Sequence, residues 1–213
     1  MHENNLWIER WKNRELGFNQ VEANPFMVKY FSSLGLDKGS KVLVPLCGKT
    51  IDISWLLARG YKVEGVELSE QAIIELFDEL DVEPTVSTVG ELIVYSAEDI
   101  TIYVGDIFKV TSGMLGKIDT IYDRAALVAL TTGLRVEYAK QLRTITSNAP
   151  QLLLCFEYDQ SLANRSPYSV DEQEVKGHYE EYYTLELLAR EEIVGGFKGK
   201  LTAFDVVWHL RDK

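Results

Sequence analysis

The chain has 213 residues, 46% of them hydrophobic, which is enough to bury the core of one domain of ordinary size. Acidic side chains outnumber basic ones by 33 to 22, and the net charge of −11, without a basic cluster, argues against a polyanionic partner such as nucleic acid. No apolar run approaches the roughly 20 residues of a membrane span, and the polar N-terminus lacks the pattern of a secretory signal. The two widely spaced cysteines, Cys47 and Cys155, are typical of a reducing compartment. We therefore expect a cytoplasmic monomer that binds neither nucleic acid nor membrane and holds no metal.

Two short helices are predicted before the first strand. Residues 5–14 carry Trp7 and Trp11 one helical turn apart. Asn24-Pro25 is a start signal for the second helix, because a capping side chain precedes a proline at the first helical position. We expect residues 1–40 to form a helical cap that lies as a lid over a core formed by residues 41–213.

The most informative stretch runs from residue 41 to residue 70. An apolar strand over residues 42–46 leads into the turn Cys47-Gly48-Lys49, then into an amphipathic helix and a second apolar strand that ends on Glu67. In doubly wound folds this order places a nucleotide at the turn and its ribose hydroxyls on the carboxylate. The stretch therefore predicts a nucleoside-binding βαβ unit.

Further strands and helices alternate along the rest of the chain. A hairpin over residues 86–95 leads into a third core strand, which ends in Gly105-Asp106, and the fourth ends in Asp123-Arg124. Ser169 and Glu172 predict a capping box for a helix through about residue 183. The remaining core strands are expected at residues 152–156, 185–194 and 203–210. We predict an α/β fold over residues 1–213 as a single domain: a Rossmann-like, seven-stranded, mostly parallel sheet with an antiparallel C-terminal hairpin and helices on both faces.

The glycine turn distinguishes between possible nucleotides. Gly48 stands alone, so the dinucleotide motif G-x-G-x-x-G is absent, and the phosphate-loop motif G-x-x-x-x-G-K-[ST] has Leu43 at its first glycine. A phosphotransferase that uses Gly48-Lys49-Thr50 remains an alternative. Acids after the second and third core strands instead suit S-adenosylmethionine, which has ribose hydroxyls and an adenine amino group but no pyrophosphate. Glu67 would accept the hydroxyls, and Asp106 would lie near the amino group with Ile107 against the ring.

The sequence of these motifs closely resembles that of the thiopurine S-methyltransferase family of S-adenosylmethionine-dependent methyltransferases. The resemblance is carried by PLCGKTIDISWLLARGYKVEGVELSE from residue 45, GDIF from 105 and YDRAALVAL from 122. WIERW and GFNQ near the start, with LLLCFEYD and SPYSV further on, extend it over nearly the whole chain. The resemblance implies cofactor contacts from Trp11, Leu46, Glu67, Asp106, Ile107 and Arg124, and an acceptor-pocket contact from Phe18.

The resemblance further implies transfer of a methyl group to the sulfur or selenium of a small acceptor, such as an aromatic thiol or a thiopurine. The cofactor is an activated electrophile, so we expect catalysis chiefly by in-line positioning and name no general base. Lys198 and Lys200 stand where animal members place an arginine beside the substrate, so inorganic selenium or tellurium species stay open as acceptors. A non-catalytic S-adenosylmethionine-binding module is a further alternative.

Overall fold

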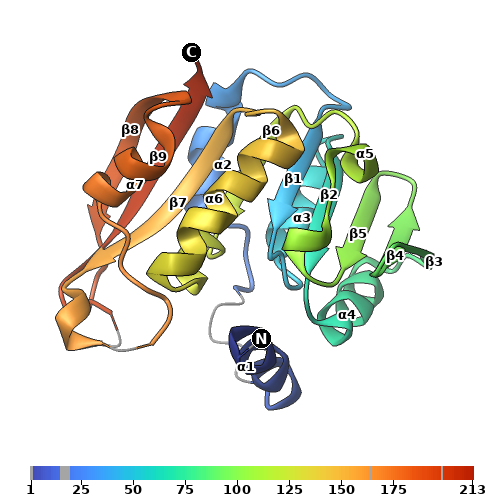
Figure 1. Cartoon of the computed structure of the whole chain (residues 1–213), viewed down its shortest axis with the longest axis horizontal. Coiled ribbons are helices and arrows are strands. Elements are labelled where there is room, and N and C mark those ends of the chain that lie inside the picture. Colours follow the sequence, from blue (N-terminus) through green and yellow to red (C-terminus); the bar gives the residue numbers. More distant parts are fainter. Residues whose placement is uncertain (1, 15–19, 164, 198) are drawn as a thin grey trace. The chain divides into compact units, whose positions relative to one another are not determined.

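The computed structural model describes residues 2–14, 20–163, 165–197 and 199–213 (Figure 1). The chain divides into two compact units, Met1–Asp119 and Thr120–Lys213, which are described one after the other. Phe18 and Lys198 lie outside the described residues. None of the helices among the described residues is long and apolar enough to cross a membrane.

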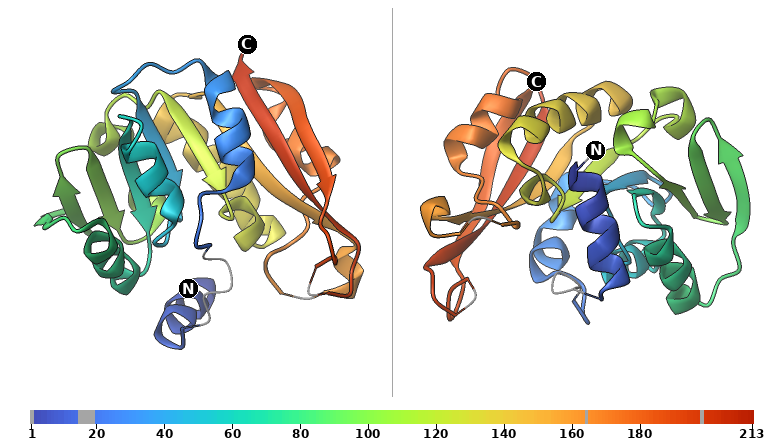
Figure 2. Two further views of the ribbon diagram at one scale, coloured as in Figure 1. Left: turned by 180° about the vertical axis from the view of Figure 1, so that it is seen from behind. Right: turned by 60° about the horizontal axis from the view of Figure 1, so that its bottom comes forward.

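The first unit is built on five strands in the order β3-β4-β5-β2-β1. β1 and β5 both run parallel to β2, whereas β3, β4 and β5 are antiparallel neighbours. The strands are β1 (Lys41–Pro45), β2 (Lys62–Glu67), β3 (Thr85–Val89), β4 (Leu92–Ala97) and β5 (Ile100–Val104). The helical elements are α1 (His2–Lys12), α2 (Pro25–Tyr30), η1 (Phe31–Leu34), α3 (Ile51–Leu57), α4 (Glu70–Leu80), η2 (Ile107–Lys109) and α5 (Ser112–Leu115). The front and back views place α3 and α5 on opposite faces of this sheet (Figures 1 and 2).

Helix α2 begins as the sequence predicts. The side chain of Asn24 accepts hydrogen bonds from the backbone N–H groups of Phe26 and Met27, and Pro25 occupies the first turn. The backbone N–H of Asn24 donates in turn to the buried carboxylate of Asp52 on α3, at 2.7 Å. The start of α2 is therefore fixed to the helix that follows the glycine turn.

The second unit contains four strands in the order β6-β7-β9-β8, and its helices α6 and α7 cover one face (Figure 1). β6 and β7 are parallel, and β9 is antiparallel to both β7 and β8. The strands are β6 (Thr120–Arg124), β7 (Gln151–Tyr158), β8 (Tyr183–Glu192) and β9 (Ala203–Asp212). The helical elements are η3 (Leu127–Ala129), α6 (Thr132–Thr146), η4 (Gln160–Leu162) and α7 (Glu172–Tyr179). The predicted antiparallel C-terminal hairpin is β8 and β9.

The predicted capping box at Ser169 is wrong. The side chain that caps α7 is Asp171, which accepts a hydrogen bond from the backbone N–H of Glu174 at 2.8 Å. The hydroxyl of Ser169 instead accepts a bond from the backbone N–H of Tyr158 on β7. The helix ends at Tyr179 rather than near residue 183, because β8 begins there. Ser169 is therefore used by a tertiary contact and not by the helix.

The predicted fold class is confirmed, with parallel strands in the interior and antiparallel strands at the edges. The described residues form nine strands rather than seven. The two additional strands are β3 and β4, which the sequence predicted as a separate hairpin and which extend the sheet of the first unit through the pairing of β4 with β5. A single domain over residues 1–213, with a helical lid over residues 1–40, stays a prediction.

Candidate functional site: the carboxyl edge of three parallel strands

The sequence-predicted cofactor residues of the first unit gather at one edge of its sheet. Pro45 at the end of β1 pairs with Val66, and Glu67 at the end of β2 pairs with Val104 at the end of β5. The connections that follow these three parallel strands therefore lie side by side. They carry Leu46, the side chain of Glu67, and Asp106 with Ile107.

Glu67 joins the three connections through hydrogen bonds. Its Oε2 accepts the backbone N–H of Gly48 and its Oε1 accepts that of Ser69, both at 2.8 Å. Its backbone carbonyl accepts the N–H of Gly105, also at 2.8 Å. Leu68 adds a third backbone donor, and because a carboxylate has about four accepting positions, one remains for a ligand hydroxyl. The side chain is buried, and burial raises the pKa of Glu67 although its backbone donors oppose that rise.

The turn after β1 is held in an unusual backbone conformation. Leu46 has φ of 46°, in the left-handed region that costs a residue with a side chain about 1–3 kcal/mol. The N–H of Cys47 bonds to the carbonyl of Val66, which fixes the turn to β2. The thiol of Cys47 packs where β2 has Gly65, since a Cβ at Gly65 would collide with Ile102 and lie 3.1 Å from Sγ. Close packing and the bonds to β2 together stabilise the strained turn.

The connection after β5 presents a carboxylate beside an apolar side chain. Asp106 is half-buried, and its Oδ1 accepts the backbone N–H of Phe108 at 3.0 Å, which starts the short helix η2. Ile107 is buried. A carboxylate and a branched apolar side chain suit an amino group on an aromatic ring, and the contact of these two residues with adenine stays a prediction.

Helix α1 contributes a buried indole. Trp11 is buried although it lies in the last part of this N-terminal helix. Arg14, just beyond the helix, is 3.8 Å from Glu75 on α4, so the end of α1 lies near α4. Phe18, the predicted acceptor-pocket residue, follows outside the described residues.

Lys49 tests whether the glycine turn could bind phosphate. Its ammonium lies 2.9 Å from Glu75 and 2.6 Å from Glu79, both on α4. These hydrogen bonds raise the pKa of Lys49, so it is charged but already paired with two carboxylates. A phosphate would have to displace two anions, so the phosphotransferase alternative is not favoured. Two carboxylates with apolar side chains instead fit a nucleoside with hydroxyl and amino groups.

Arg124 belongs to the second unit, where it ends β6. It pairs with Leu154 on β7 and is half-buried. Burial raises the pKa of Asp205 on β9, and the positive charge of nearby Arg124 opposes that rise. The next residue, Ala125, has φ of 62°. The contact of Arg124 with the cofactor stays a prediction.

A cavity of about 580 Å³ in the second unit was not predicted from the sequence. Its walls include the aromatic rings of Tyr158 and Phe204 and the buried Arg135, whose Nε lies 2.8 Å from Glu174. These residues come from α6, β7, α7 and β9, and only the tertiary fold brings them together. Among the described residues, no cluster of three or more His, Cys, Asp or Glu side chains could hold a metal ion.

Solved structures share this fold. The 1,6-didemethyltoxoflavin-N1-methyltransferase of Burkholderia thailandensis, solved with 1,6-didemethyltoxoflavin and S-adenosylhomocysteine, matches with a TM-score of 0.67 at 14% identity, over 98% of this chain and 87% of that one. A SAM-dependent methyltransferase from Anabaena variabilis matches with a TM-score of 0.64 at 14% identity, over 98% of this chain and 95% of that one. The fold is that of S-adenosylmethionine-dependent methyltransferases.

Sequence relatives define the family. The family model for thiopurine S-methyltransferase matches residues 2–209. The thiopurine S-methyltransferase of Teredinibacter turnerae is 49% identical over 205 residues, covering 96% of this chain and 95% of the relative. That of Xanthobacter autotrophicus is 45% identical over 209 residues, 98% of each chain. The chain belongs to the thiopurine S-methyltransferase family. The predicted class, an S-adenosylmethionine-dependent S-methyltransferase, is confirmed.

Proposed function

We propose that this protein transfers the methyl group of S-adenosylmethionine to the sulfur or selenium of a small acceptor, with aromatic thiols and thiopurines as the first class to consider. The observation that supports this most directly is the position of Glu67. Its carboxylate, bonded to the connections after β1 and β2, keeps an accepting site for the ribose hydroxyls at the edge of the three parallel strands. Relatives that share up to 49% identity are named for thiopurine methylation.

The residues of the chain would bind and orient rather than exchange protons. When bound, the cofactor supplies a methyl group that is already activated for nucleophilic attack. Glu67 would bind the ribose, and Asp106 with Ile107 would bind the adenine. Leu46, in the turn after β1, would contact the cofactor beside them. We also assign cofactor contacts to Trp11 and Arg124, and an acceptor contact to Phe18. Alignment of the acceptor sulfur with the methyl group, in a site from which water is excluded, would then supply most of the rate enhancement.

The cellular setting is part of the proposal. Both cysteines, Cys47 and Cys155, are buried free thiols, which suits a reducing cytoplasm. The net charge of −11 disfavours nucleic acid and supports a monomer that repels its own copies. Light scattering of the purified protein tests the monomer: a mass of about twice 24.2 kDa would contradict it.

The experiment that tests the function combines binding with transfer. Calorimetric titration should show micromolar binding of S-adenosylmethionine and S-adenosylhomocysteine and none of ATP. Methyl transfer is then measured to thiophenol, to a thiopurine and to selenite, with phenol as the control that lacks only the sulfur. Transfer to a sulfur or selenium acceptor but not to phenol supports the proposal. Tight cofactor binding without transfer to any of them would instead favour a non-catalytic binding module.

A further inference from the structure

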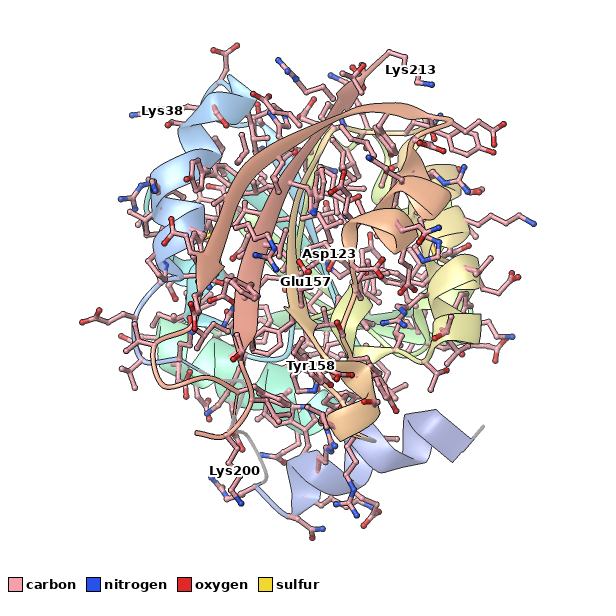
Figure 3. All side chains as sticks on the ribbon, turned by 90° about the vertical axis from the view of Figure 1, so that its left-hand side faces the viewer. Lys38, Asp123, Glu157, Tyr158, Lys200 and Lys213 are labelled. Carbon is pink, nitrogen blue, oxygen red and sulfur yellow. The ribbon has the colours of Figure 1, made fainter. Side chains whose placement is uncertain are left out.

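A second buried carboxylate lies at the end of β6, one residue before Arg124. The side chain of Asp123 is fully buried, whereas Arg124 beside it is only half-buried. Figure 3 shows Asp123 between the strands and the helices of its unit. Burial raises the pKa of Asp123 to about 6, although its hydrogen-bond donors oppose that rise. An acid kept at such a position needs a reason, because an apolar residue would avoid the cost of burying a charge.

The hydrogen bonds of Asp123 span the turn that contains Arg124. Its Oδ2 accepts the hydroxyl of Tyr138 on α6 at 2.8 Å, and its Oδ1 accepts the backbone N–H of Leu127 at 3.2 Å. We call these two hydrogen bonds the Asp123 bridge. Ala125 lies in the chain between Asp123 and Leu127, and its φ of 62° is in the left-handed region. A side-chain-bearing residue stays in that region only when its surroundings hold it there.

We propose that Asp123, anchored by Tyr138, is a positioning residue that fixes the direction in which Arg124 leaves β6 and thereby sets the affinity for the cofactor. The inference rests on the proposed function, in which Arg124 contacts the cofactor. Asp123 touches no ligand itself, because no part of its carboxylate reaches the surface.

The bridge makes this role depend on pH. Ionised Asp123 accepts at both oxygens, whereas protonated Asp123 carries a hydrogen that must find an acceptor of its own. The titratable groups of the same unit that interact with it are Tyr138, Tyr179 and Cys155, and the ion pair of Arg135 with Glu174 lies near Cys155. Burial raises the pKa of both tyrosines and of the thiol well above their ordinary values, so these three stay neutral between about pH 5 and pH 8. Asp123 therefore titrates within this cluster in that range.

Three variants test the bridge through the affinity for S-adenosylhomocysteine, measured by calorimetry between about pH 5 and pH 8. Asp123→Ala removes the bridge, and we expect the affinity at about pH 8 to fall at least tenfold. Asp123→Asn keeps an acceptor for Leu127 and can donate to Tyr138, so we expect the affinity to fall only about threefold. Because the amide does not titrate, this loss of affinity should not increase as the pH is lowered. Tyr138→Phe removes a donor that lowers the pKa of Asp123, so its acid-dependent loss should begin at higher pH than in the unmodified protein.

Controls separate positioning from folding and from the wider proposal. Tyr182→Phe removes an exposed hydroxyl in the same unit and should leave both affinity and pH profile unchanged. If Asp123→Ala does not fold, the two milder variants decide through their pH profiles. Unmodified affinity in folded Asp123→Ala, or pH profiles that coincide in all folded variants, would overturn the role of Asp123. A native protein that binds no S-adenosylhomocysteine at any pH would instead overturn the proposed function together with this inference.

Discussion

Glu67 in the first unit and Asp123 in the second are two buried carboxylates with different surroundings. Glu67 is the last residue of β2 and Asp123 the last but one of β6, and burial raises the pKa of each. Glu67 is bonded by backbone N–H groups of two separate connections, which it links, and we propose that its remaining accepting position binds the cofactor. The carboxylate of Asp123 accepts the hydroxyl of Tyr138 and has no exposed surface. The two roles that we propose, ligand binding for Glu67 and positioning for Asp123, thus differ because different donors surround the two acids.

The largest expected effect comes from breaking the Glu67 side of this comparison. Glu67→Ala should weaken binding of S-adenosylmethionine by roughly 1–3 kcal/mol, because it removes a charged acceptor and leaves two backbone donors without their partner. Calorimetry measures the change, and Glu98→Ala, at an exposed turn of the same unit, is the matched control. Equal affinities in the two variants would remove Glu67 from the site.

The Asp123 side predicts an effect on stability with a defined sign. The folded pKa of about 6 lies above the ordinary value of 3.8, so between these values the unfolded chain ionises while the folded protein stays protonated, and stability falls as the pH rises. Asp123→Asn does not lose stability in this way, because its amide does not titrate. Its free energy of unfolding relative to the unmodified protein should therefore grow by about 2 kcal/mol between about pH 4 and pH 8.

Chemical denaturation across that pH range measures this difference. Asp37→Asn, the same substitution at an exposed position, is the matched control. A difference in the free energy of unfolding for Asp123→Asn that stays constant, or that shrinks as the pH rises, would show that folding does not raise the pKa of Asp123.

The smallest effect is expected at Lys49, which lies next to Gly48 but is paired with acids of α4. Lys49→Ala should change the affinity for S-adenosylmethionine by no more than about twofold and the stability by about 0–1 kcal/mol, because partly exposed ion pairs contribute little. Calorimetry and denaturation measure both, with Lys109→Ala as a control that breaks a similar pair with Glu91. ATP binding that disappears in Lys49→Ala would revive the phosphate-site alternative.

The sequence predicted the strands that carry the first-unit site because buried parallel strands read as continuous apolar runs. Residues 100–104 were predicted and observed as β5, and Glu67 and Asp106 follow directly from where such strands end. The partners of Lys49 on α4 could not be predicted, since they are 26 and 30 positions away and no local pattern records a contact between elements. The same reason explains Ser169, whose hydroxyl bonds to β7 instead of capping α7.

Asp123 shows the limit most clearly. Its strand end was predicted, but whether its carboxylate faces a ligand or a tyrosine depends on the side of β6 that α6 covers. Tyr138 lies 15 positions away, on a helix whose apolar pattern predicts burial and not a hydrogen-bond partner. Sequence patterns therefore located both acids and could not separate their roles.

Because Cys47 packs over Gly65, the reaction of its thiol can report local opening of the glycine turn. The thiol is buried, and burial raises its pKa, so little thiolate is accessible for alkylation while the glycine turn stays closed. Cys155 lies equally buried in the second unit. The labelling rates of these two native thiols would therefore time the transient unfolding of the two units separately, without any introduced probe.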